Sequence, residues 1–325
     1  MSIDSGNMWG DEVNILVTGA SSPLGEMVVQ RLLEDSRVGM VLAVCDKGQP
    51  LTIPSNNRLE TVTQDLRRQR GLHDLLFGRA RDLNIEVVVH TSQEMKTSRT
   101  GAAAHALNVD AVRGILDFSE RHPTIKRLVM RSCVEVYQVQ RDLPALISEE
   151  HPLNMNEGAP QWVRDRVEAD VTACTRMGLS SFDILVLRMA EILAPGTGSQ
   201  MYDYLQSKIC FRPIGFDPML NFLSLHDAAS SLYRAVFAKK QGVFNIPGAD
   251  SLPLSQVISH WNCKSIPLPE YQISLYYRLR QTFLGGQFRY GMNRRRFHYS
   301  GILDGRRAGN ILKYIPSCPI VWPDE

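Results

Sequence analysis

Two glycines, Gly19 and Gly25, have the spacing of a loop that lets a phosphate group approach the backbone closely. An apolar run at residues 15–17 precedes them, and apolar side chains recur at helical spacing over residues 26–33. A strand, a tight turn and a helix in this order direct the N–H groups of the helix start toward a pyrophosphate. The segment therefore predicts a dinucleotide-binding loop, although any tight turn from strand to helix also favours glycine.

An acidic side chain, Asp46, follows the next apolar run at residues 40–44. A carboxylate at the end of the second strand accepts hydrogen bonds from the adenosine ribose and repels a 2′-phosphate. This favours NAD over NADP, with the neighbouring Lys47 acting in the opposite direction. The alternative is an ordinary solvated Asp at a strand end.

Strands and helices alternate along most of the chain. Further strands are predicted at residues 59–62, 85–90, 128–130, 184–188 and 222–225, and helices at 72–83, 108–118 and 162–177. This order predicts an α/β fold with a doubly wound, mostly parallel sheet (a Rossmann domain) and a small C-terminal substrate lobe. The predicted division is a loose tail at 1–12, a nucleotide-binding domain at 13–190 and a lobe at 191–325, from which residues 222–247 return to the first domain. His90, at a strand end, is a candidate for the cofactor site or an ordinary packed histidine.

The composition excludes several classes of protein. The chain has 325 residues, is 44% hydrophobic and carries a formal charge of +2, which is too near neutral to indicate nucleic acid. Its six cysteines include no C-x-x-C pair, so neither a metal cluster nor a disulfide framework is predicted. No apolar region of the kind found in signal peptides and no run of about 18 apolar residues appears, so neither secretion nor a membrane span is predicted. We therefore expect a cytoplasmic protein.

Seven short motifs in the right order resemble the extended short-chain dehydrogenase/reductase superfamily, in its NAD-dependent epimerase/dehydratase form, over roughly residues 13–315. The glycine loop resembles the family's T-G-x-x-G-x-x-G, with Ser22 in place of the middle glycine. The other matches are Asp65-Leu66, His90-Thr91-Ser92 for H-x-A-A, Asn108 opening an N-V-x-G-T helix, residues 132–137 for S-S-x-x-V-Y-G, Leu187-Arg188 for L-R-P, and residues 222–227 for F-x-H-V-x-D. The resemblance implies cofactor contacts from Gly19, Ser21, Ser22, Leu24, Gly25, Asp46, Asp65, Leu66, Thr91, Ser92, Asn108, Ser132 and Arg166.

The catalytic pair that the resemblance implies is absent. The family uses a tyrosine as general acid/base, one helical turn before a lysine that lowers its pKa. At these positions the chain has Trp162, whose indole cannot exchange a proton, and Arg166, which does not titrate. The orienting Ser/Thr falls on Cys133, and Tyr137 is the fallback acid. A literal Y-x-x-x-K at residues 204–208 lies after the sixth predicted strand, outside the expected helix.

These departures predict a nucleotide-binding protein that senses or scaffolds without turnover. The alternative is an active oxidoreductase, epimerase or dehydratase with a non-standard acid/base. Asn221 replaces the family's diphosphate-binding arginine, so a lipid or another substrate that is not a nucleotide sugar is favoured for that alternative. The third hypothesis is a structural relic of the family that binds no cofactor.

One segment is unusually basic and aromatic. Residues 271–303 contain no Asp or Glu but include Arg278, Arg280, Arg289, Arg294, Arg295 and Arg296. Within it, Tyr276, Leu279 and Phe283 share one helical stripe. This predicts contact with anionic lipid or an acyl ligand, and hence a peripheral position at a membrane surface, or else a lobe core with a basic rim. The resemblance also implies a homodimer through a four-helix contact of residues 103–120 and 162–177.

Overall fold

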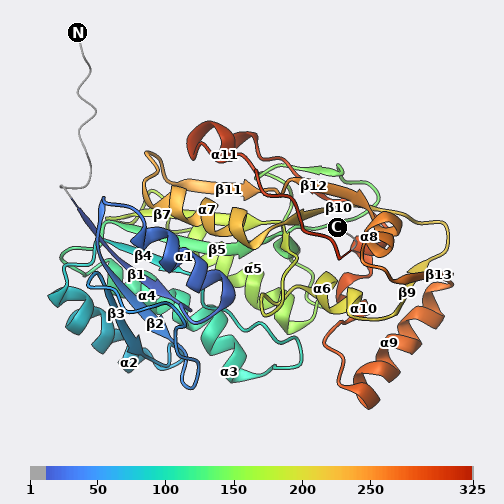
Figure 1. The fold of residues 1–325 in the computed structure, drawn as a ribbon, viewed down its shortest axis with the longest axis horizontal. Coiled ribbons are helices and arrows are strands. Elements are labelled where there is room, and N and C mark those ends of the chain that lie inside the picture. The colour runs from blue at the N-terminus through green and yellow to red at the C-terminus, as the bar shows by residue number, and fades with distance from the viewer. Residues whose placement is uncertain (1–11, 324–325) are drawn as a thin grey trace, which may run out of the picture.

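A seven-stranded, wholly parallel sheet forms the centre of the molecule (Figure 1). The computed structural model describes residues 12–323 and gives the strand order β11-β7-β5-β4-β1-β2-β3. The chain thus runs outward from β1 in one direction and then crosses to β4 on the other side, which confirms the predicted doubly wound arrangement. The bounds are β1 Val13–Thr18, β2 Val38–Cys45, β3 Leu59–Thr63, β4 Val87–His90, β5 Arg127–Cys133, β7 Asp183–Met189 and β11 Gly242–Ile246.

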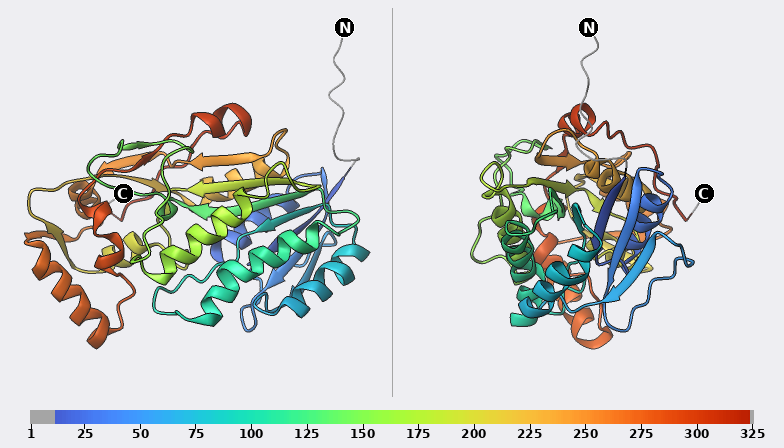
Figure 2. Two further views of the ribbon diagram at one scale, coloured as in Figure 1. Left: turned by 180° about the vertical axis from the view of Figure 1, so that it is seen from behind. Right: turned by 90° about the vertical axis from the view of Figure 1, so that its left-hand side faces the viewer.

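Helices cover both faces of this sheet because each carries one apolar stripe. Leu24, Val28 and Leu32 recur every fourth residue of α1 and are buried beside α7. The helices α2, α4 and α5 cover the opposite face, as the left view of Figure 2 shows. The bounds are α1 Pro23–Leu33, α7 Leu225–Val236, α2 Gln69–Leu75, η1 Leu76–Ala80, α3 Ala102–His105, η2 Ala106–Asp110, α4 Ala111–Ser119, α5 Gln161–Cys174 and α11 Arg306–Ile311.

Small sheets and short helices form a lobe beyond the carboxyl ends of the central strands (Figure 1). The buried aromatic rings of Tyr204, Tyr277, Phe288 and Phe297 form its core. Four of the eight aromatic residues at 271–303 therefore pack in the lobe core, namely Tyr277, Phe288, Tyr290 and Phe297. The bounds are β8 Glu191–Ile192, β10 Met219–Leu223, β12 Asp250–Pro253, β9 Ile209–Pro213, β13 Lys264–Leu268, β6 Leu146–Ile147, β14 Ile302–Leu303, α6 Gln200–Leu205, α8 Leu254–His260, α9 Glu270–Leu284, α10 Tyr290–Asn293, η3 Val134–Val136 and η4 Arg295–Phe297.

The strand predicted at residues 222–225 differs in position and role. It forms as β10, which pairs with β8 and β12 in a three-stranded sheet outside the central one. The chain instead returns to the central sheet through α7, which packs on it, and β11, which pairs with β7. The strand β11 is only five residues long and its apolar run is interrupted by Asn245, so its sequence pattern does not distinguish it from a loop.

The predicted tail lies almost entirely outside the described residues, since only Glu12 belongs to the described part. Among the helices of residues 12–323, none has the length and apolar character required to cross a bilayer.

Candidate functional site

The glycine loop begins directly after β1. Gly19 has a φ of +66°, in the left-handed region, and a Cβ placed on it would lie 2.9 Å from the Cα of Ser92. A Cβ on Gly25 would lie 2.1 Å from the carbonyl oxygen of Gly19. One glycine is therefore required for the turn and the other for the close packing of α1, as their spacing predicts.

The start of α1 has fewer free backbone N–H groups for binding an anion than the spacing of Gly19 and Gly25 predicts. The side chain of Ser22 caps the helix, because its Oγ accepts from the N–H of Gly25 at 3.1 Å and donates to the carbonyl of Gly19 at 2.7 Å. Pro23 is the first residue of α1 and has no N–H. One donor is thus bonded within the chain and another is missing.

The loop forms one wall of a cavity of about 540 Å³, here called the glycine-loop cavity. The cavity lies at the carboxyl ends of β1 and β4, where the direction of the sheet order reverses and where ligands bind in this architecture. Residues 93–96 and Gln287, which follows α9, also line it. The predicted contacts that line it are Gly19, Ser21, Ser22, Asp46, Thr91 and Ser92.

The glycine-loop cavity carries more acidic than basic side chains. The charged residues that line it are Asp46, Glu94, Lys96, Arg99 and Asp203. Burial raises the pKa of Asp46, whose backbone N–H donates to Ser21 Oγ at 3.2 Å. Burial, together with the charge of Glu191, raises the pKa of Asp203 to about 6. A ligand with a further phosphate near Asp46 would meet repulsion there.

Several predicted cofactor residues lie outside this lining. Leu24 and Leu66 are buried in the two cores beside the sheet. Asp65 forms an ion pair with Arg67 at 2.8 Å. Asn108 supports the cavity from outside its lining. Its Oδ1 accepts from the backbone N–H of Glu94 at 2.8 Å and so fixes a residue that lines the cavity.

His90 is a packed residue of the sheet. Its Nδ1 lies 2.8 Å from the hydroxyl of Thr18. Complete burial lowers the pKa of His90 to about 4, so the ring is neutral at physiological pH. Its side chain therefore contributes to the core, and the cavity begins at the next residue, Thr91.

Trp162 and Arg166 form one stacked unit on α5. They are one helical turn apart, and the guanidinium carbon of Arg166 lies 3.4 Å from the centre of an indole ring of Trp162. Both residues are about 5% exposed. Arg166 also donates to the backbone carbonyls of Trp162 and Glu94, each at 3.4 Å, and its burial lowers its pKa. The indole Nε1 has no hydrogen-bond partner among the described residues.

A narrow slot, here called the arginine slot, continues from the glycine-loop cavity toward this pair. It encloses only about 20 Å³, and its lining includes Arg131 and Arg166. Burial and the charge of Arg166 lower the pKa of Arg131 to about 10. Arg131 donates to the carbonyl of Thr197 at 3.0 Å. The slot therefore combines two buried cations with very little free space.

Cys133 and Glu135 lie at the end of β5, next to the slot. Burial raises the pKa of Cys133 well above its usual range, so its sulfur is a protonated thiol. Burial acts against ionisation of Glu135, but the charge of Arg296 holds its pKa below the ordinary value. Arg296 binds Glu135 at 3.2 Å and the buried Glu191 at 2.7 Å.

Ser132 and Tyr137 belong to a buried polar network. Asp170 accepts from the hydroxyl of Ser132 at 2.5 Å and from the guanidinium of Arg188 at 2.6 and 3.0 Å. The hydroxyl of Tyr137 donates to Asn245 at 2.6 Å and accepts from Arg188 at 3.1 Å. Burial raises the pKa of Tyr137 to about 12. The fallback acid is thus held in a structural role.

The other two candidates for chemistry are also structural. Tyr204 is completely buried in the lobe, where its hydroxyl donates to the carbonyl of Phe211 at 3.1 Å, while Lys208 is exposed. The amide of Asn221 donates to the carbonyl of Gly248 at 3.1 Å and accepts its N–H at 2.9 Å. Asn221 thereby joins β10 to the following loop.

A second cavity, of about 260 Å³ and here called the arginine cavity, lies on the far side of Trp162. Glu135 and Trp162 line it from the central domain, and the consecutive Arg294, Arg295 and Arg296 line it from the lobe. The sequence predicted this triplet as part of a segment that contacts anionic lipid or an acyl ligand, or that forms a basic rim of the lobe. It did not select Glu135, Glu191, Asp203 or Gln287 as site residues. The signal for Glu135 was its place within the S-S-x-x-V-Y-G match.

No protein-family model matches the chain. Uncharacterised proteins of Mycobacterium tuberculosis and Mycobacterium bovis are 27% identical to it over 311 residues, which cover 93% of this chain and 80% of each relative.

Solved structures of similar fold cover nearly the whole chain at low identity. A UDP-glucuronic acid 4-epimerase from Bacillus cereus, in complex with UDP-glucuronic acid and NAD, has a TM-score of 0.70 at 16% identity, over 94% of this chain and 95% of that one. An epimerase from Methanothermobacter thermautotrophicus has a TM-score of 0.71 at 13% identity, over 95% and 89%. A dTDP-glucose 4,6-dehydratase from Bacillus anthracis, in complex with NAD, has a TM-score of 0.68 at 16% identity, over 94% and 92%. The chain has the fold of these NAD-dependent epimerases and dehydratases.

Proposed function

We propose that this chain binds NAD as a sensor or scaffold and does not turn it over. The observation that carries the proposal is the Trp162–Arg166 stack, which occupies the positions of the expected acid and its lysine and is buried on both sides. Indole has no accessible acid–base equilibrium, and a guanidinium keeps its proton. The neighbouring groups do not replace the pair, since Cys133 is a protonated thiol and the hydroxyl of Tyr137 is bonded to Asn245.

The glycine-loop cavity suits the adenosine diphosphate half of the cofactor. Gly19 and Gly25 allow the backbone to approach the pyrophosphate, and Asp46 is placed to accept from the ribose hydroxyls. When bound, NAD brings a nicotinamide that can carry hydride. The continuing arginine slot has only about 20 Å³ of free space, so the nicotinamide end would contribute little to binding unless the slot opens. Asp46 and Asp203 disfavour a ligand with an additional phosphate.

Calorimetric titration separates these expectations. NAD and ADP-ribose should bind with dissociation constants within about threefold of each other, because the shared half makes most contacts, and NADP should bind at least about tenfold more weakly. Binding should tighten as the pH falls from 7.5 toward 5.5, since Asp203, with its pKa of about 6, becomes neutral beside the ligand. No heat and no thermal shift with any of these ligands would remove the proposal.

Ser22→Gly should strengthen NAD binding by up to about tenfold, because it releases the N–H of Gly25 toward the pyrophosphate. Replacing this helix cap by glycine costs only a few tenths of a kcal/mol of stability. The matched control is Ser224→Gly, which removes the equivalent cap of α7, where the serine accepts from the N–H of Asp227. Unchanged or weaker binding in Ser22→Gly, with the fold intact, would contradict this use of the loop.

An active oxidoreductase, epimerase or dehydratase is the second candidate, and the arginine cavity favours it. This cavity brings the ionised Glu135 next to Trp162, with Arg295 available for a negatively charged substrate that is not a nucleotide sugar. Conversion of bound NAD to NADH, followed by absorbance at intact cofactor occupancy, would support it. Loss of that conversion in Tyr137→Phe would assign the proton transfer to the fallback tyrosine.

We further propose that α9 transmits the state of the glycine-loop cavity to an anionic lipid surface. Tyr271, Leu275, Leu279 and Phe283 recur every fourth residue and are 70%, 56%, 47% and 78% exposed. This is a continuous apolar stripe, which contains two of the three residues predicted for it. The third, Tyr276, makes an edge-to-face contact with Phe211, with ring centroids 4.5 Å apart.

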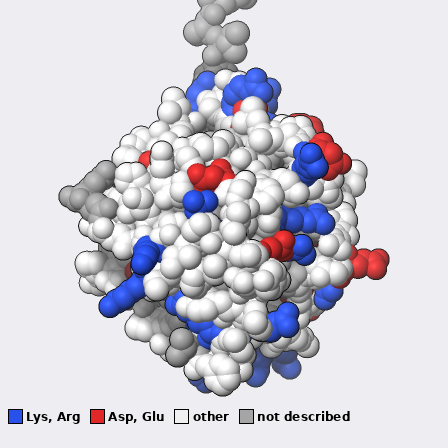
Figure 3. Space-filling model, turned by 90° about the vertical axis from the view of Figure 1, so that its right-hand side faces the viewer, with Lys and Arg blue, Asp and Glu red and all other residues white. Residues whose placement is uncertain are grey.

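The charge around the stripe fits a negatively charged membrane. Residues 265–303 contain six arginines and one acidic residue, Glu270. Arg294 pairs with Glu270 and Arg296 with Glu191, while Arg278 and Arg295 are exposed. Figure 3 views this end of the molecule, whose largely uncharged surface carries scattered basic side chains and fewer acidic ones. An apolar helical stripe with basic flanks is the pattern of interfacial helices.

A short chain of contacts joins α9 to the cavity. Gln287, three residues after the helix, lines the glycine-loop cavity. Its backbone carbonyl accepts from Thr97 at 2.8 Å and from Gln200 at 3.3 Å. A ligand in the cavity therefore bears directly on the segment that fixes the end of α9.

Flotation with vesicles tests the lipid surface. Binding is expected to vesicles of phosphatidylcholine with phosphatidylglycerol, to weaken with salt, and to change when NAD is added. Leu279→Ser/Phe283→Ser should reduce partition at least about tenfold, whereas Leu179→Ser, at a leucine 82% exposed on another face, should not. Equal partition of the wild type and the Leu279→Ser/Phe283→Ser variant, or no preference for anionic vesicles, would contradict the proposal. It would also be contradicted if the wild type self-associates and the double variant does not, because the stripe would then be a contact between copies of the chain.

The homodimer that the resemblance implies stays a prediction. Exposed ion pairs join α4 to α5 and to the residues just after it, Arg113 with Glu168 at 2.6 Å and Arg176 with Asp117 at 2.5 Å. A contact through these helices would therefore be polar.

A further inference from the structure

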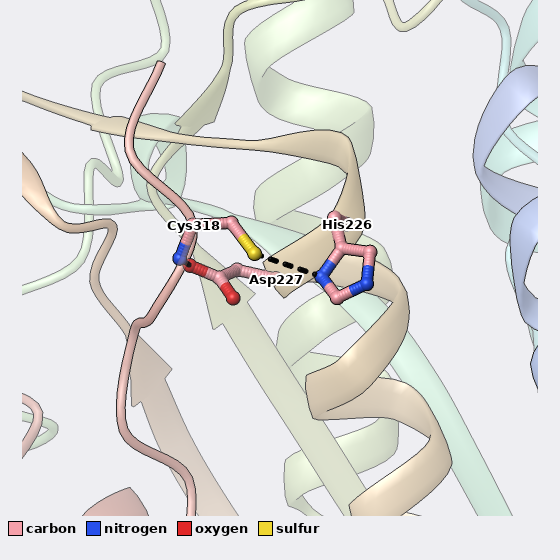
Figure 4. Close-up of side chains that lie close together, drawn as sticks. All are labelled: His226, Asp227 and Cys318. Carbon is pink, nitrogen blue, oxygen red and sulfur yellow. Dashed lines mark hydrogen bonds between the residues drawn. The ribbon is translucent and has the colours of Figure 1, made fainter. Parts of the chain in front are cut away.

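Three chemically active side chains meet on the surface beside α7, away from both cavities (Figure 4). His226 and Asp227 lie in the first turn of α7, and Cys318 lies on the extended segment near the end of the described chain. Their potential ligand or acid–base atoms all lie within 4.8 Å of one another. Neither the proposed cofactor site nor the α9 surface uses them.

Asp227 fixes the position of the cysteine. It is 1% exposed, and its carboxylate accepts from the backbone N–H groups of Ser317 and Cys318, both at 2.9 Å, and from the hydroxyl of Ser317 at 3.2 Å. Three donors thus hold the extended segment against the start of α7. The thiol of Cys318 is half-buried and points toward His226 (Figure 4).

The hydrogen bonds of His226 determine which nitrogen carries its proton. The Nε2 atom lies 3.2 Å from a guanidinium nitrogen of Arg31, which can only donate. Nε2 must therefore accept, and the proton of the neutral ring is on Nδ1. Nδ1 lies 3.1 Å from the sulfur of Cys318, so this N–H is directed at the sulfur. A donor at the sulfur with a cation behind it is the setting of a reactive thiol.

The same tautomer argues against a metal ion. A zinc ion between these side chains would need the lone pair of Nδ1, and the second nitrogen would then donate to an acceptor. Arg31 offers a donor at that nitrogen and adds a positive charge close to the ion. The donors to Asp227 already occupy both of its oxygens.

The other cysteines of the chain lack this environment. Burial raises the pKa of each of these five thiols: Cys45, Cys133, Cys174, Cys210 and Cys263. A surface depression of about 510 Å³ reaches His226 and is lined by Arg31 and Arg37 together with Glu34 and Asp35, the latter paired with Arg37 at 2.7 Å. Cys318 lies outside this lining and is itself half-buried, so a small reagent reaches its sulfur from the surface.

We propose that Cys318 is a reactive thiol that exchanges with small disulfides, with His226 and Arg31 as its positioning residues. The sulfur of Cys318 loses its proton to solvent and forms a bond to one sulfur of the disulfide. The S–S bond of the reagent breaks, and its other half leaves as a thiolate. The protein sulfur is oxidised and the small disulfide is reduced in the same step.

Oxidised glutathione is the probe, applied to the intact chain without dinucleotide, so the outcome is independent of the proposed cofactor binding. Mass mapping of peptides should find one mixed disulfide per chain, on Cys318. His226→Gln should slow its formation about tenfold and move its pH profile to higher pH, and Arg31→Gln should act in the same direction. His73→Gln, at an exposed histidine that contacts Asp74, Phe77 and Phe118, is the matched control.

Three outcomes would overturn the proposal. They are a label distributed over Cys174 and Cys263, an unchanged rate in His226→Gln, and one zinc ion per chain that protects Cys318 from the reagent. Thermal melting of each variant verifies that the fold is retained. Cys318→Ser supplies a second check that does not depend on the histidine, because it should abolish labelling entirely.

Discussion

Asp170→Asn is expected to lower the free energy of unfolding by about 3–5 kcal/mol, because it leaves the charge of Arg188 buried without a counterion. Asp170 is completely buried, and Arg188 is 4% exposed. Asp170 pairs with Arg188 at 2.6 Å, and its charge, against the opposing effect of burial, holds the pKa of Arg188 above its usual range. The pair joins α5 to β7, and Ser132 adds β5. Urea unfolding of both proteins measures the difference.

A surface ion pair provides the control for Asp170→Asn. Asp117→Asn removes the partner of Arg176, in a pair whose side chains are 39% and 52% exposed. Exposed pairs contribute between 0 and about 1 kcal/mol. Equal destabilisation by the two substitutions would mean that burial of the Asp170 pair has no energetic role.

Gly19→Val should weaken NAD binding at least about 100-fold. The valine would have to adopt a φ of +66°, which costs β-branched residues most, and its Cβ would lie 2.9 Å from the backbone of Ser92. Either the loop or the segment after β4 must then move, and both line the glycine-loop cavity. Titration by calorimetry gives the affinity, and thermal melting gives the remaining stability.

Gly178→Val separates the effect of strain from the effect on the site. Gly178 has a φ of +74°, and a Cβ there would meet nothing within 4 Å. Gly178→Val should lower the free energy of unfolding by about as much as Gly19→Val, but it should keep the full affinity for NAD. If both variants bind equally well, the glycine loop is not the binding element.

The central sheet follows from the sequence because buried parallel strands leave a strong pattern. The runs before Gly19 and Asp46 are continuous apolar segments that end at polar residues, and all of these strands form. The strand β11 escaped prediction since its five residues include Gly242 and Asn245, which interrupt the apolar run. The side chain of Asn245 is used instead in the hydrogen bond from Tyr137.

The site was only partly predictable, for a different physical reason. The glycine loop, Asp46 and Thr91 are close to strand ends in sequence, so their meeting follows from topology alone. Asp203 and Gln287 come from the lobe, and the path of an irregular chain does not reveal that they close the same cavity. The stack of Trp162 on Arg166 required the rotamers of both side chains, which spacing does not determine.

The single helix α1 has an additional consequence, because its two ends serve different sites. It starts with the cap of Ser22 at the glycine loop and carries Arg31, the partner of His226, in its last turn. Its eleven residues make a rod of about 16 Å. One rigid helix thus connects the glycine loop to the surroundings of Cys318. If a bound nucleotide changes the free energy of oxidation of the thiol through this helix, oxidation of the thiol must change the free energy of nucleotide binding by the same amount.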